Sequence, residues 1–147
     1  MNKEQALVDI HEAKHALVVQ MRKMEDLIGG MDVPNPIAAA KEKCEFGKWL
    51  YSYDNHMREI LGEQFYKRLE VLHKKWFVDY MKIFDMFVHE DEKTFLSKLL
   101  HGGNISSLNL DKAKLYFLEL KETTTELLVA LDKSERRLNA LNESKFY

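Results

Sequence analysis

The chain has 147 residues, of which 46% are hydrophobic and 31% charged, so it has the size of one ordinary domain with a sizeable core. Its formal net charge is −2, and the interleaved charges form no concentrated basic face of the kind that nucleic-acid binding requires. No apolar run approaches the roughly 20 residues that span a bilayer, and the amino terminus has no signal-peptide core. We therefore expect a cytoplasmic protein without a membrane or nucleic-acid partner, and its single cysteine fits a reducing compartment.

The distribution of helix breakers predicts an all-α protein. The two prolines and the glycines other than Gly47 fall where helices would begin or end, and the β-branched residues are too scattered to form alternating strands. We expect a four-helix bundle of the antiparallel up-down type with an additional short or broken helix.

The first predicted helix runs from Lys3 to Ile28, where apolar residues recur at spacings of three and four, and Gly29-Gly30 ends it. Val8, His15 and Val19 fall outside this apolar stripe. The helix should therefore contact neighbours on two sides, either within a bundle or across a dimer.

The second predicted helix begins at Asn35, a good N-cap, followed by Pro36, a good first helical residue, and continues to about Tyr51. Cys44 therefore lies on a helix. A short helical piece from Asn55 to Leu61 should follow.

The third predicted helix, from Glu63 to about Val88, is the main core helix. A charged run at 89–93 should loosen it, and a further apolar stretch should end at His101-Gly102-Gly103. Its core ladder consists of Phe65, Leu69, Leu72, Trp76, Tyr80, Ile83, Phe84 and Phe87.

The last predicted helix is capped by Asn109 or Asp111 and runs to about Leu141. We expect one domain over residues 1–141 and a frayed tail over residues 142–147. The core positions of this helix are Leu115, Leu118, Leu127, Leu128, Leu131 and Leu138.

The octet from Cys44 to Tyr51, Cys-Glu-Phe-Gly-Lys-Trp-Leu-Tyr, combines the only cysteine with aromatic residues and a glycine inside a helical pattern. Gly47 costs roughly 1 kcal/mol in a helix interior relative to alanine, which indicates a close neighbour. The octet resembles the signature of the chemoreceptor zinc-binding family, a four-helix-bundle module in which one cysteine and three histidines hold zinc.

The resemblance extends to three other places. His15 lies close to where the family carries its first histidine, and His73 follows Phe65-x-x-x-Leu69-Glu70, which is similar to the family's third-helix segment. The last helix, with Leu127-Leu128-x-x-Leu131, is similar to the family's closing helix. The resemblance thus implies that His15, Cys44 and His73 are zinc ligands. The family has a further histidine one turn after His73, at the position that Phe77 occupies here.

Three arrangements remain open for the missing ligand. Water could complete an open site, His11 could supply the nitrogen from one turn before His15, or the site could be degenerate and empty. The residues also have ordinary interpretations: Cys44 as a small buried hydrophobe, His73 as a core histidine, and His11 and His15 as surface residues.

Together with this resemblance, the residues lead us to expect a zinc-binding sensory or regulatory bundle, not an enzyme, in which the metal or the cysteine state alters helix packing. The resemblance implies a role in bacterial signal transduction of the chemotaxis or cyclic-di-GMP type. We expect a homodimer, and the resemblance implies a chemoreceptor or a diguanylate cyclase as its signalling partner. The alternative is a metal-free bundle that serves as a protein-interaction or dimerisation module.

Overall fold

The protein is all-α. A computed structural model describes residues 2–31, 45–52, 56–92 and 107–146, with the backbone alone for residues 45 and 88–92. The helices within these ranges are α1 (Lys3–Ile28), α2 (Glu45–Tyr51), α3 (Met57–Leu61), α4 (Glu63–Glu92), α6 (Ser107–Ala140) and the 3-10 helix η2 (Glu143–Phe146).

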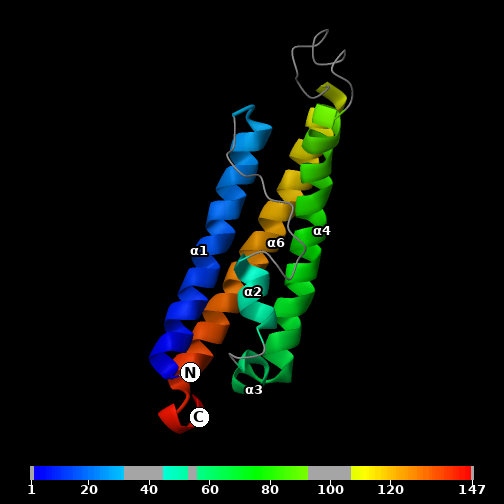
Figure 1. Ribbon diagram of the computed structural model, residues 1–147. Coiled ribbons are helices and arrows are strands. Elements are labelled where there is room, and N and C mark those ends of the chain that lie inside the picture. The colour runs from blue at the N-terminus through cyan, green and yellow to red at the C-terminus, as the bar shows by residue number, and fades with distance from the viewer. Residues whose placement is uncertain (1, 32–44, 53–55, 93–106, 147) are drawn as a thin grey trace.

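Three long helices, α1, α4 and α6, run side by side, and α6 runs opposite to the other two (Figure 1). α6 packs against both α1 and α4, while the short α2 packs against the same two helices. α3 and both chain ends lie at one end of the molecule (Figure 1). No helix within the described ranges is long and apolar enough to cross a membrane.

The predicted bounds of the first helix are confirmed. The Asn2 side chain accepts a hydrogen bond from the Gln5 backbone N–H at 2.7 Å, which satisfies a donor that the first turn leaves open. At the other end the Gly29 N–H donates to the Glu25 carbonyl, and Gly30 has a φ of +82°, a conformation that suits glycine.

α4 is the main core helix, as predicted, and it begins at Glu63. Its buried side chains include Leu69, Leu72, Trp76, Tyr80, Ile83 and Phe84. The helix continues through the charged residues to Glu92. The prediction that the charged run loosens the helix is therefore wrong for residues 89–92. The expected end at His101 lies outside the described residues, as does the start of the second predicted helix at Asn35.

α6 differs from the prediction in two respects. It begins at Ser107, so Asn109 and Asp111 lie inside the helix and do not cap it. Leu115 and Leu118 are 63% and 59% exposed, not in the core. The reason is geometric: Leu118 is nine residues from the buried Leu127, and nine residues turn a helix by about 180°.

The chain end also differs from the expected frayed tail over 142–147. Residues Glu143–Phe146 form η2, and the Phe146 side chain is buried. The Lys3 ammonium donates to the Asn139 and Leu141 carbonyls at 2.6 and 2.9 Å. Because these carbonyls lie at the end of α6, Lys3 links the beginning of α1 to that end.

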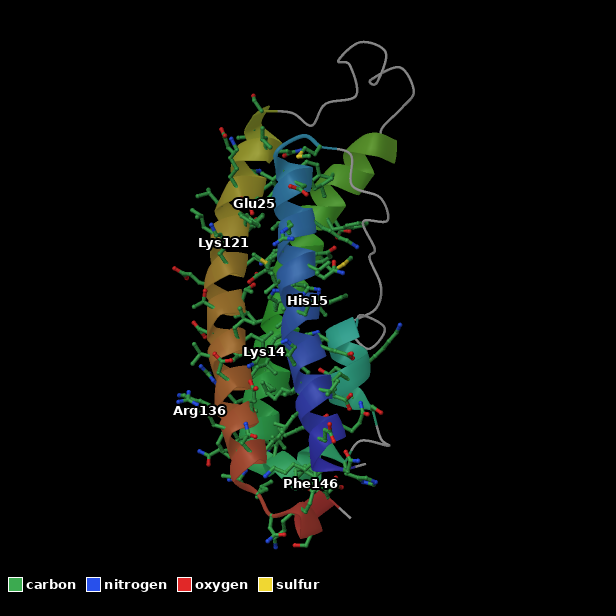
Figure 2. All side chains as sticks on the ribbon, turned by 90° about the vertical axis from the view of Figure 1, so that its left-hand side faces the viewer. Lys14, His15, Glu25, Lys121, Arg136 and Phe146 are labelled. Atoms are coloured by element: carbon green, nitrogen blue, oxygen red, sulfur yellow. The ribbon has the colours of Figure 1, made fainter. Side chains whose placement is uncertain are left out.

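Polar contacts join the long helices, and two of them are examples. The buried indole N–H of Trp76 on α4 donates to the Thr124 hydroxyl on α6 at 2.8 Å. The Lys14 ammonium on α1 forms ion pairs with Asp132, at 2.6 Å, and Glu135 of α6. Figure 2 labels Lys14 on the side of α1 that meets α6. The first contact holds α6 against α4, and the second holds α6 against α1.

Candidate metal centre

His73 is wholly buried, with 0% of its surface exposed. The imidazole lies 4.8 Å from the Phe46 ring and 5.9 Å from the Tyr51 ring, both on α2, measured between centroids. On α4 itself the ring stacks against Trp76 at 6.4 Å with an interplanar angle of 13°. The side chain is therefore enclosed by aromatic rings on the flank of α4 that faces α2.

α2 covers this histidine because its apolar residues point inward. Phe46 and Leu50 are buried, and the Trp49 ring lies 5.5 Å from that of Phe46. The Tyr66 hydroxyl of α4 donates to the Leu50 carbonyl at 3.0 Å, which ties the C-terminal end of α2 to α4. Gly47 is buried as well.

His15 lies on α1 and is exposed. It lines a groove of about 710 Å³ between α1 and α2, together with Trp49, Lys48 and Ser52 of the α2 region. Figure 2 shows His15 on α1, with α2 beside that helix. His11 is also exposed but is absent from the described lining of this groove.

Cys44 lies outside the described residues, as do the side chains of His89 and His101. Within the described ranges, no group of three or more histidine, cysteine, aspartate or glutamate side chains could hold a metal ion. The structure thus places His15 and His73 on two helices that both contact α2, whereas Cys44 precedes the described part of that region.

Phe77 occupies the position one turn after His73. Its ring is half-buried and lies 6.4 Å from the imidazole at an interplanar angle of 50°. A phenyl ring has no lone pair for a metal, so Phe77 packs against His73 and supplies no ligand.

Asp79 is a buried titratable residue that the sequence analysis missed. It is 4% exposed, its Oδ2 has no hydrogen-bond partner among the described residues, and its Oδ1 lies 3.8 Å from the Lys82 ammonium. Burial raises the pKa of Asp79, and Glu119 on α6 raises it further, whereas Lys82 and Lys75 lower it. The spacing of three and four residues from Leu72 through Trp76 to Asp79 could have revealed this core position.

Comparison with known proteins gives no relative: no protein-family profile, no curated protein and no solved structure matches this chain.

Proposed function

We propose that the protein is a cytoplasmic zinc-binding sensory bundle, in which α1, α2, α4 and α6 form a four-helix bundle of the antiparallel up-down type. The contacts support this proposal because α2 and α6 each pack against both α1 and α4. In such bundles, metal sites are built from side chains on facing helices.

The observation that carries the proposal is the contact between His73 and Phe46. The two ring centroids are 4.8 Å apart, and Cys44 precedes Phe46 by two residues. Two residues span at most about 7 Å between Cα atoms, so the cysteine belongs to the same neighbourhood as the buried imidazole. A thiolate and imidazoles are the ligands that zinc prefers.

We assign His73, Cys44 and His15 as the protein ligands, with the fourth position taken by water or by His11. The exposed position of His15 on the α1 face that meets α2 leaves its side chain free to turn toward the start of α2. Zinc would supply a cross-link between helices and would keep the Cys44 thiol deprotonated.

The proposed signalling step depends on the helices that the metal would join. Loss of the metal, or oxidation of the Cys44 thiolate to a sulfenate by a peroxide that is itself reduced to water, would remove the sulfur attachment of the α2 region to α1 and α4. Because α2 is short and covers His73 through Phe46 and Tyr51, its packing is the part of the bundle that such a change alters first. A chemoreceptor or a diguanylate cyclase would read this change as a separate partner.

The test is the metal content of the full chain, purified without a histidine tag. We expect about one zinc ion per chain in the wild type, and loss of most of it in Cys44→Ala and His73→Ala. His15→Ala should weaken binding, and His11→Ala shows whether that residue is the fourth ligand. His56→Ala is the matched control, since His56 is exposed at the start of α3. A wild-type protein without metal, or one whose zinc survives Cys44→Ala, contradicts the proposal.

A metal-free interaction module is the second candidate, and the enclosure of His73 by aromatic rings favours it. Phe77 adds apolar packing where a further ligand would stand. In that case the melting temperature is the same with and without chelator, whereas a zinc-linked bundle loses stability when the metal is removed.

A further inference from the structure

One face of the molecule, formed by the outer sides of α4 and α6, carries exposed aliphatic side chains. Val71 and Val78 on α4 are 58% and 53% exposed and lie seven residues apart, which places them on one side of the helix. Leu115, Leu118 and Val129 on α6 are similarly exposed. Val71 and Val129 line the same groove between the two helices, with a volume of about 530 Å³. We call this surface the α4–α6 face.

The charges on the α4–α6 face are separated by helix. The α4 side is basic, and its exposed members are Lys67, Arg68, Lys75 and Lys82. The α6 side is acidic, and its exposed members are Glu119, Glu122 and Glu126. The exceptions include Asp85 on α4 and Lys133 and Arg136 on α6, which lie toward the ends of the face. A basic row therefore runs beside an acidic row, with the aliphatic side chains among them.

The register of these rows is set by contacts between the helices. Trp76 pairs with Thr124 at 2.8 Å, and the Arg68 guanidinium lies 3.6 Å from the Glu126 carboxylate. α4 and α6 run in opposite directions (Figure 1). Lys75 and Glu122 consequently lie near the middle of the face, at similar heights along it.

We infer that the α4–α6 face binds a second copy of this chain, about a twofold axis parallel to the helices, with α4 of each protomer against α6 of its partner. Such an axis brings residues of equal height together. Val71 then meets Val129 of the other protomer, Val78 approaches Leu118, and the basic row faces the acidic row. An axis perpendicular to the helices would set α4 against α4 and oppose the two basic rows, which like-charge repulsion disfavours.

The two kinds of side chain have different tasks in this interface. Burial of the aliphatic residues supplies the affinity, because exposed ion pairs contribute little each. The charge rows select the orientation and reject alternatives. The inference deepens the homodimer of the proposed function by naming its face, and it requires neither zinc nor Cys44.

The test exchanges the two central charges, and sedimentation velocity of the full chain measures the association. Lys75→Glu alone and Glu122→Lys alone each place like charges opposite one another, so we expect the dimer dissociation constant to rise at least tenfold. The double variant Lys75→Glu/Glu122→Lys restores the opposite charges and should dimerise like the wild type. An equimolar mixture of the two single variants should form a mixed dimer, because both of its contact rows then pair opposite charges: Glu at position 75 with Lys at position 122 in one row, and Lys75 with Glu122 in the other.

Lys121→Glu and Glu25→Lys are matched controls, because both residues are exposed and carry the same charge changes to the side of the molecule shown in Figure 2. Lys121 lies away from the acidic row, since the five residues from Lys121 to Glu126 turn α6 by about 140°. These controls should dimerise normally. A monomeric wild type, single variants that dimerise like the wild type, or a double variant that stays monomeric would each overturn the inference. Zinc content, measured in the same samples, reports on the metal proposal independently.

Discussion

The hydrogen bond between Trp76 and Thr124 allows a quantitative test of how α4 and α6 are held together. Thr124 accepts from the buried indole N–H at 2.8 Å and donates its own hydroxyl proton to the Leu120 carbonyl at 2.7 Å. Thr124→Val keeps the shape of the side chain but removes the acceptor, which leaves the indole N–H unpaired beside a side chain that is 6% exposed. A buried donor without a partner costs about 1–3 kcal/mol.

Thr125→Val is the matched control. The Thr125 hydroxyl makes the same type of bond, to the Lys121 carbonyl at 3.0 Å, but it is exposed to water. We expect this variant to change the free energy of unfolding by less than about 0.5 kcal/mol. Thr124→Val should lower it by about 1–3 kcal/mol, which lowers the melting temperature by roughly 2–4 °C per kcal/mol in a domain of this size.

Urea unfolding followed by circular dichroism measures both variants. A double-mutant cycle with Trp76→Phe then isolates the pair, because Thr124→Val should cost less by about 1 kcal/mol when the indole is already absent. Equal destabilisation by Thr124→Val and Thr125→Val, or a coupling free energy near zero, would refute the reasoning.

Three further predictions concern the buried acid, the chain end and the missing ligand. Burial raises the pKa of Asp79, so its contribution to stability is complete at acidic pH and is lost as pH rises through the raised pKa. Asp79→Asn should therefore melt above the wild type at pH 7 and approach it at acidic pH, whereas a constant difference across pH would contradict this. Lys3→Met removes the donor to the Asn139 and Leu141 carbonyls. Backbone amide hydrogen exchange should become faster around Phe146 and stay unchanged in the middle of α4. Unchanged exchange at both places would argue against the link between Lys3 and the end of α6. Phe77→His restores a fourth ligand beside His73, so competition with a chelator should give at least tenfold tighter zinc binding, and equal affinity would count against a three-ligand protein site.

Local signals allowed most of the helices to be predicted. α1 was predicted with its correct bounds because its apolar residues recur at helical spacing and the Gly29-Gly30 pair is a strong stop signal, whereas the Asn2 cap was not recognised. The inward side of α6 was harder, since leucines at spacings of three and four fit more than one helical stripe. The structure selects the side that contains Leu127, and Leu118 faces outward.

The candidate site was predictable only in part. The burial of His73 follows from its place beside the α4 ladder, but its enclosure by Phe46 and Tyr51 depends on how α2 packs, which no local pattern specifies. Asp79 was missed because a charged residue normally marks the solvent face of a helix. Phe146 was missed because terminal residues usually remain unpacked unless tertiary contacts hold them.

The central proposal is that His15 on α1, His73 on α4 and Cys44 bind one metal ion, and cobalt(II) titration tests this most directly. Cobalt(II) takes the place of zinc and reports thiolate ligation by a charge-transfer absorption band in the near ultraviolet. The account predicts that the wild type develops this band to saturation at one metal ion per chain, that Cys44→Ser abolishes it, and that His73→Ala weakens the binding that produces it. A wild type without the band, or a band of the same intensity in Cys44→Ser, would contradict it.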